Sequence, residues 1–199
     1  MPDPPNGSLI TVYVLENPYP VGVICLALAV MMGWSGLYRG RLKWLPIAVL
    51  LGLTGLGVLV TGWLVRTAGE HSRRLTQSFV DEVVAGDVRR ATALLAADAT
   101  LAFDSPRNPG YDLKVIKDYL EKLAIEKLID SNRVTHLRGY TKSGDIGECH
   151  LTCWTTPSSG FGPVRSQWVL WVERQDDGSW LISRITCVSI NDRPASRYR

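Results

Sequence analysis

The stretch 133–190 decides the fold class, because four segments within it are typical of β-strands: RVTHLRGYTK (133–142), GECHLTCWTT (147–156), VRSQWVLWVERQ (164–175) and SWLISRITCVSI (179–190). Thr, Val, Ile and Trp, which suit a pleated and half-buried surface, are frequent in all four. The turn signals SGD and DDG, together with a longer Pro- and Gly-containing loop, separate them. The pattern predicts a four-stranded meander.

Helical patterns precede these strands. Apolar residues at helical spacing predict helices at 71–85, 88–95 and 113–123. Gly86 is suited to end the first helix, and Asp87 and Asp112 are suited to cap the second and third. A short apolar strand is expected at 100–103, and a basic, disordered tail at 192–199. Helices followed by strands predict an α+β domain at 67–191, with three helices packed on a four- to five-stranded antiparallel sheet.

Three local sequences in this region resemble the NTF2-like superfamily, which includes ketosteroid isomerases and SnoaL-type cyclases. They read FVDEVVAGD at 79–87, LLAADATL at 94–101 and GSWLI at 178–182. The resemblance implies a cone-shaped domain that binds a small hydrophobic molecule, catalyses a reaction or holds a partner protein, often as a homodimer through its sheet. Fold alone does not choose among these functions.

The resemblance also allows a test of isomerase chemistry. Asp104 falls near the place of the family's proton-shuttling carboxylate, displaced by one residue. Phe79 stands where those enzymes have a tyrosine that stabilises an oxyanion, and Leu170 falls near their second, acidic donor. The loss of one such donor costs roughly 3–4 kcal/mol of transition-state stabilisation. The resemblance therefore implies that isomerase activity is absent, while Asp104 stays a candidate general base for another lyase, cyclase or isomerase reaction.

Aromatic residues suggest where a ligand would bind. Trp154 and Trp168 lie on predicted strands and could wall an apolar pocket under the helices, or they could serve in core packing and a dimer contact. The residues expected to line a pocket are Phe79, Phe103, Tyr119, His150, Trp154 and Trp168. No HxH or HExxH pattern occurs, so neither a metal nor a cofactor is predicted.

The charge of the predicted domain excludes one class of partner. Residues 67–199 hold 18 of the 22 basic and 17 of the 19 acidic residues, so the formal charge is 18 − 17 = +1. A nearly neutral domain lacks the basic footprint of a nucleic-acid-binding protein. No nucleic-acid partner is predicted.

Two apolar segments, 21–38 and 44–65, follow an N-terminal tail at 1–20. Each is long enough to cross the bilayer core as a helix, so 21–65 is expected to form a transmembrane hairpin in the lipid bilayer. Arg39, Arg41 and Lys43 lie in the connecting loop, and residues 1–20 contain no Lys or Arg. The positive-inside rule then places the soluble domain outside the cytoplasm.

These observations predict a membrane-anchored domain that acts as a binding or scaffolding module. Its partner would be a protein held through the sheet, a second copy of the chain, or a small apolar ligand in the cone. The alternative is a small-molecule enzyme with Asp104 as its base.

Overall fold

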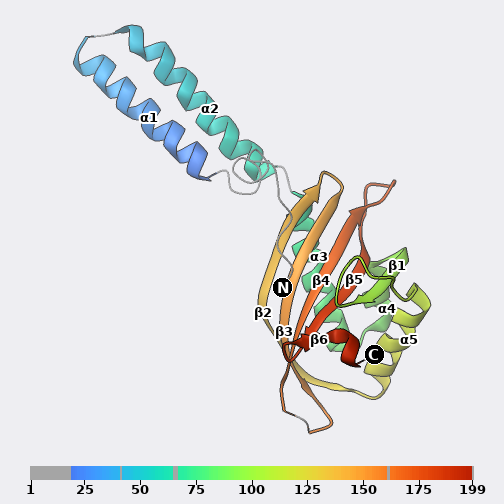
Figure 1. Ribbon diagram of the computed structural model, residues 1–199. Coiled ribbons are helices and arrows are strands. Elements are labelled where there is room, and N and C mark those ends of the chain that lie inside the picture. Colours follow the sequence, from blue (N-terminus) through green and yellow to red (C-terminus); the bar gives the residue numbers. More distant parts are fainter. Residues whose placement is uncertain (1–18, 41, 65–66, 161, 199) are drawn as a thin grey trace. The chain divides into compact units, whose positions relative to one another are not determined.

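Two helices begin the part of the chain that the computed structural model describes, which comprises residues 19–40, 42–64, 67–160 and 162–198. The chain divides into two units, with a boundary in the sequence between Thr67 and Ala68, and each unit is described separately below (Figure 1). The predicted tail at 1–20 lies outside the described residues, except for its last two positions.

The first unit is a helical hairpin of α1 (Tyr19–Tyr38), the short 3₁₀ helix η2 (Leu42–Trp44) and α2 (Leu45–Leu64). Glycines bring its two long helices together. A Cβ atom on Gly22 would lie 2.5 Å from Leu59 Cγ, and one on Gly55 would lie 3.0 Å from Cys25 Cβ. Small residues allow such close approach where no hydrophobic effect drives helices together.

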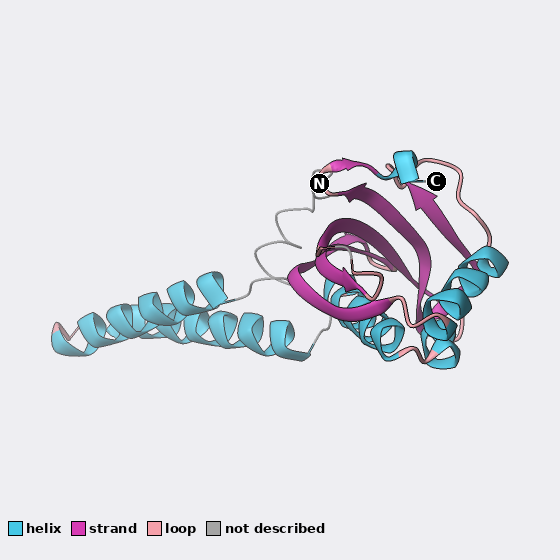
Figure 2. Ribbon diagram, turned by 90° about the horizontal axis from the view of Figure 1, so that it is seen from below, coloured by secondary structure: helices cyan, strands magenta, loops and turns pink. Residues whose placement is uncertain are grey.

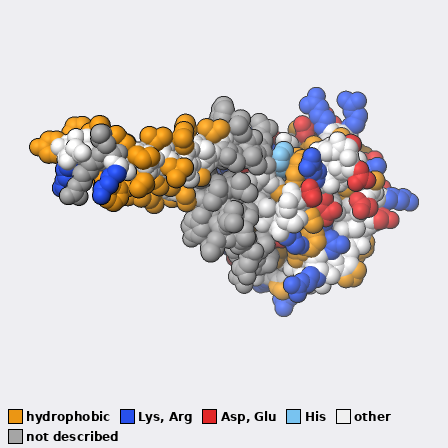
Figure 3. Space-filling model, turned by 90° about the horizontal axis from the view of Figure 1, so that it is seen from above, with side chains coloured by type: hydrophobic (Ala, Val, Ile, Leu, Met, Phe, Trp, Pro, Cys, Tyr) orange, Lys and Arg blue, Asp and Glu red, His pale blue; other side chains and the backbone are white. Residues whose placement is uncertain are grey.

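The outside of this hairpin is apolar. Most of the large hydrophobic side chains that the structure leaves exposed lie on α1 and α2, and Figure 3 shows them as a nearly continuous hydrophobic surface. Among the described residues, α1 is the one helix long and apolar enough to cross a membrane. The apolar part found for α2, Leu45–Val60, is shorter, and position 65 of the second predicted span lies outside the described residues. The structure thus supports one candidate span where the sequence predicts two.

The second unit contains a curled sheet whose strand order is β1-β5-β4-β3-β2, with β6 paired to β5. The strands are β1 (Leu95–Phe103), β2 (Ile129–Ser143), β3 (Ile146–Pro157), β4 (Val164–Arg174), β5 (Trp180–Ile190) and β6 (Arg193–Pro194). The predicted meander is confirmed, because β2 to β5 pair antiparallel in chain order.

The expectation of a purely antiparallel sheet is wrong. Strand β1 pairs parallel with β5, with Leu101 opposite Ile185, so the sheet is mixed. Two tight turns and one longer loop connect neighbouring strands of the meander, and such short connections make those strands antiparallel. No turn joins β1 to β5, because α5 and three strands separate them in the chain, and the local sequence therefore leaves their relative direction open.

Helices α3 (Ala68–Ala85), α4 (Val88–Ala93) and α5 (Leu113–Ile125) cover one face of the sheet (Figure 2). Both predicted caps are confirmed. The Asp87 carboxylate accepts a hydrogen bond from the Arg90 amide at 2.9 Å, and the Asp112 carboxylate accepts one from the Val115 amide at 3.1 Å. Such caps satisfy amides that lack partners at a helix start.

The second helix is shorter than predicted. It ends at Ala93, and residues 95–99 extend β1 instead of the helix. The Ile182 amide donates to the Leu94 carbonyl at 2.9 Å, and Leu95 lies opposite Ile182 in the parallel pair. Strand pairing with β5 therefore overrides the helix propensity of this alanine-rich stretch.

The C-terminal segment is also ordered where the sequence predicts a disordered basic tail. Residues 193–194 form β6, and the 3₁₀ helix η3 spans Ala195–Tyr198. Ala195 is fully buried, and the Ser196 amide donates to the Asp104 carboxylate at 2.8 Å. A buried side chain and a charge-assisted hydrogen bond hold this segment against the domain. Arg199 lies outside the described residues.

Candidate functional site: an apolar cavity

An open cavity of about 580 Å³ lies between the helices and the sheet of the second unit. Ligand pockets in proteins commonly measure about 300–1,000 Å³. The cavity is lined by Phe79, Val80, Val83, Val84, Leu101, Phe103, Ile116, Tyr119, Leu120, Leu123, Leu128, Ile129, Asn132, Leu151, Cys153, Thr155, Pro157, Val164, Ser166, Trp168, Leu170, Ile185 and Ile190.

The periodicity of each element explains this wall. On α3, Phe79 and Val83 are four residues apart and so lie on one face of the helix. On β3, Leu151, Cys153 and Thr155 alternate along the strand and so project to the same side of the sheet. The same alternation places His150 and Trp154 on the other side.

Two lining residues with substantial solvent exposure show where the cavity opens. Tyr119 is 51% exposed on α5, and Val84 is 38% exposed near the end of α3. Ile125, six residues beyond Tyr119 at the end of α5, is 79% exposed but does not line the cavity. The accessible part of the wall therefore includes a rim formed by α3 and α5.

The structure brings together four of the six predicted pocket residues. Phe79, Phe103, Tyr119 and Trp168 all line the cavity. Phe79 also belongs to the hydrophobic core, whereas Trp168 packs against that core and donates its indole N–H to Ser166 Oγ at 2.8 Å. Leu170, the residue near the second donor position of the isomerases, is also part of the wall.

The other two predicted residues lie elsewhere. His150 is buried on the sheet face that points away from the cavity, and Trp154, on the same face, is 43% exposed. The prediction placed His150 and Trp154 on the cavity wall, whereas the alternation of side chains along β3 directs both to the face opposite that of Leu151.

Asp104, the candidate base, is likewise absent from the cavity wall. It follows β1 with a positive φ of 65°, and its amide donates to the Cys187 carbonyl at 2.8 Å. Its carboxylate accepts the Ser196 amide of the C-terminal segment. The structure thus places Asp104 where it holds the chain terminus.

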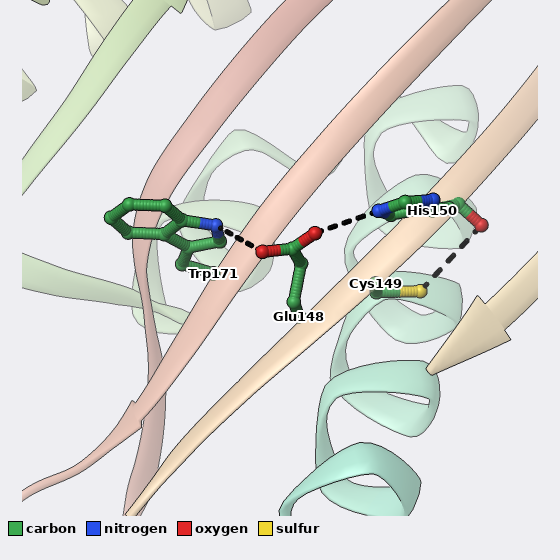
Figure 4. A network of polar contacts seen from close by, with 4 residues as sticks. All are labelled: Glu148, Cys149, His150 and Trp171. Atoms are coloured by element: carbon green, nitrogen blue, oxygen red, sulfur yellow. Dashed lines mark hydrogen bonds and ion pairs between the residues drawn. The ribbon is translucent and has the colours of Figure 1, made fainter. Parts of the chain in front are cut away.

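His150 takes part in a polar network on the far face of the sheet (Figure 4). Its Nε2 lies 2.7 Å from one oxygen of Glu148, and the other oxygen accepts a hydrogen bond from the Trp171 indole at 3.0 Å. The Lys142 ammonium lies 3.3 Å from the centre of the Trp171 ring. A histidine oriented by a carboxylate is a general-base arrangement, but here it has no connection to the cavity.

The chemistry available inside the cavity is limited. None of its lining residues is Asp, Glu, Lys, Arg or His. Burial raises the pKa of the Cys153 thiol although a hydrogen bond from Asn132 opposes this shift, so the group is neutral at physiological pH. Among the described residues, no group of three or more His, Cys, Asp and Glu side chains is arranged to hold a metal ion.

Sequence reasoning missed most of the wall. Aliphatic residues such as Leu123 and Val164 give no signal that separates a cavity wall from a packed core. The neutral polar residues Asn132 and Ser166 were also missed. A polar residue on the inward-facing register of a strand was the available signal, since buried positions normally exclude such groups.

No family model matches the chain, and no curated protein matches it. Solved structures do. An NTF2-like protein of unknown function from Pseudomonas putida KT2440 matches with a TM-score of 0.50 and 17% identity, over 60% of this chain and 84% of that one. A protein from Shewanella frigidimarina NCIMB 400, provisionally assigned as a ketosteroid isomerase, has a TM-score of 0.49 and 14% identity, over 61% and 94%. A domain of unknown function with a cystatin-like fold from Nostoc punctiforme PCC 73102 has a TM-score of 0.48 and 14% identity, over 67% and 83%.

Identities this low show the fold alone. The match to the Pseudomonas putida protein agrees with the three helices and the curled mixed sheet. The second unit of this chain is an α+β domain with the NTF2-like cone fold.

Proposed function

We propose that this protein binds a small apolar molecule in the cavity of its NTF2-like domain. The observation that carries the proposal is an open cavity of about 580 Å³ whose lining is almost entirely aliphatic and aromatic. Protein interiors are normally packed as densely as organic crystals, with few voids larger than a water molecule. A space of this size is therefore more than core packing requires, and its wall favours a hydrocarbon occupant.

The same wall supports binding over acid–base catalysis. A general acid or base must lie within hydrogen-bond reach of the reacting group, directly or through one water molecule. The ionisable side chains of the lining are those of Tyr119 and Cys153, while Phe79 and Leu170 are apolar where the isomerases need donors. Asp104 lies off the wall and binds Ser196, so we do not assign it the role of a base.

We further propose that α1 and α2 anchor the domain in a membrane as two spans. The apolar outer surface of the hairpin supports this, because exposed side chains such as Leu53 and Leu56 would otherwise face water. The glycine contacts supply the packing that membrane helices use. The basic loop at 39–43 favours a domain outside the cytoplasm. If a reporter that functions only in the cytoplasm is active when fused to the C-terminus, this orientation is contradicted.

A pair of variants on α5 tests the binding proposal. Leu123→Trp places an indole into the cavity, whereas Ile125→Trp adds the same group to a position that is 79% exposed and off the wall. Each CH₂ group buried by a ligand contributes about 0.8 kcal/mol, and about 1.4 kcal/mol is a tenfold change in affinity. An indole that displaces two or more CH₂ groups should thus weaken binding about tenfold.

The assay is photolabelling of the full-length protein in lipid nanodiscs with a decanol that carries a diazirine group. We expect adducts on peptides from α3, α5 and β4 in the wild type and in Ile125→Trp, and about tenfold weaker labelling in Leu123→Trp. Equal labelling of the two variants, or adducts on α1 and α2 only, would contradict the proposal.

A further inference from the structure

Neutral polar side chains occur on the sheet wall of the cavity, on three neighbouring strands. Asn132 belongs to β2, Thr155 to β3 and Ser166 to β4, and all three line the cavity. Asn132 is opposite Thr155, and Ser166 is opposite Cys153, two positions away on β3. We call Asn132, Thr155 and Ser166 the polar row.

Some hydrogen-bonding capacity of the polar row is used within the protein. The Thr155 hydroxyl donates to Asn132 Oδ1 at 2.8 Å, and the Asn132 amide contacts Cys153 Sγ at 3.8 Å. The Trp168 indole donates to Ser166 Oγ at 2.8 Å. These contacts fix the orientation of the row, because each side chain is held by a neighbour.

The Ser166 hydroxyl is a donor that remains available in the row, as does one N–H of the Asn132 amide. Ser166 accepts from Trp168, and its own hydroxyl hydrogen has no acceptor among the described residues. The side chain is buried, with Ser166 only 8% exposed, and it lines the cavity. A buried hydroxyl gains a hydrogen bond when a ligand oxygen accepts its proton.

The wall also selects against charge. A carboxylate or an ammonium group that enters an apolar site loses its hydration, and it needs an opposite charge or several strong hydrogen bonds in return. None of the lining residues carries a formal charge at neutral pH. The cavity offers a charged group no compensation of that kind.

We infer that the ligand is an uncharged, mainly hydrocarbon molecule with a hydroxyl or carbonyl oxygen, and that this oxygen accepts a hydrogen bond from Ser166. The inference rests on the proposed binding function and assigns its ligand class. The hydrocarbon part of the ligand contacts side chains such as Phe79, Leu120 and Leu170. Neutral lipid-like alcohols, ketones and esters fit this description, whereas fatty-acid anions and cationic amphiphiles do not.

The test compares three decyl compounds as competitors of the photolabel on the full-length protein in nanodiscs. The compounds are 1-decanol, decanoate and decyltrimethylammonium, used at pH 8 with their partition into empty nanodiscs measured separately. We expect 1-decanol to compete at concentrations at least about tenfold lower than either ion, because a charge buried without a partner is strongly disfavoured. Decanoate should compete better as the pH falls toward 5, because its neutral form becomes populated.

Variants at one position test the hydrogen bond. Ser166→Ala should weaken competition by 1-decanol roughly threefold to tenfold, the range expected for one neutral hydrogen bond. Ser166→Thr keeps the hydroxyl and should retain most of the affinity. Ser183→Ala, the same change at a part-buried serine outside the cavity, should have no effect.

The outcomes separate this inference from the proposed function. If decanoate competes as well as 1-decanol at pH 8, or if Ser166→Ala competes like the wild type, the inference is overturned while apolar binding stands. If no compound competes and no cavity peptide is labelled, the proposed function itself is overturned.

Discussion

The contact between the start of α3 and the β2–β3 hairpin makes one prediction that can be worked out in detail. A Cβ atom on Gly147 would lie 2.8 Å from the carbonyl carbon of Ala68 and 2.8 Å from Ser72 Cβ, and closer still to the Ala68 carbonyl oxygen. Ordinary contacts of this kind begin at 3.4 Å. Gly147→Ala therefore forces the helix away from the sheet by at least 3.4 − 2.8 = 0.6 Å, because the Ala68 atoms in the way are backbone atoms.

The cost follows from two terms. Overpacking of this kind costs about 1–3 kcal/mol. A displaced helix start also weakens the bond from the Gly69 amide to Thr141 Oγ1, now 3.1 Å, worth about 1 kcal/mol. Alanine lowers the conformational entropy of the unfolded chain relative to glycine, and this effect stabilises the folded state by about 0.5 kcal/mol. We expect a net loss of about 2–3 kcal/mol, or a melting temperature lower by roughly 6–15 °C for a domain of this size.

The assay is thermal unfolding of the full-length protein in nanodiscs, followed by near-ultraviolet circular dichroism of the sheet tryptophans. Gly144→Ala is the matched control, because a Cβ atom at this turn position has no neighbour within 4 Å and the residue lacks a positive φ. We expect the control to melt within about 2 °C of the wild type. Equal melting temperatures for Gly147→Ala and the wild type would refute the packing described here.

Three further predictions concern the buried thiols, a helix cap and the C-terminal segment. Burial raises the pKa of the Cys149 thiol to about 11 and that of the Cys187 thiol to about 12, from 9.0. The stability that the protonated thiols confer is therefore complete below pH 9 and is lost as the pH rises toward 12. Urea unfolding should show a lower midpoint at pH 10 than at pH 8, and equal midpoints would contradict this. Asp112→Ala should cost about 1 kcal/mol in the same urea assay because it removes the cap of α5, and Asp112→Asn should cost less. Asp104→Ala should speed hydrogen exchange at the Ser196 amide and leave cavity labelling unchanged; a drop in labelling would argue that Asp104 belongs to the site.

The sequence predicts much of this fold because its signals are local. The meander follows from four segments of strand-forming residues with turn signals between them, and the caps at Asp87 and Asp112 follow from single residues before helical patterns. Each signal acts within a few residues, so sequence periodicity is sufficient to read it.

Long-range pairing explains what the sequence could not predict. Residues 95–99 have helix-forming composition, yet the hydrogen bond from Ile182 to Leu94 commits them to β1. The C-terminal residues look like a basic tail, yet Asp104, 92 positions earlier, holds Ser196. Neither partner is visible from the local pattern, because the sheet brings together segments that are distant in the chain.

Only part of the candidate site could be predicted, because only some of its residues give a local signal in the sequence. Aromatic residues can be recognised in the sequence as candidates for a pocket wall, and two of these candidates, Phe79 and Trp168, line the cavity. The sequence does not show whether an apolar face is filled by its neighbours or left open, and therefore the cavity itself could not be predicted. The face on which His150 lies depends on the register of β3, which the structure alone supplies.

The most direct measurement of the central claim is an anomalous diffraction experiment on crystals of the full-length protein grown with 10-bromodecan-1-ol. The bromine atom marks the ligand independently of the protein model. Our account predicts a bromine peak inside the cavity, among the side chains of α3, α5 and β4. A cavity closed by side chains, or bromine peaks confined to the surface of α1 and α2, would contradict it.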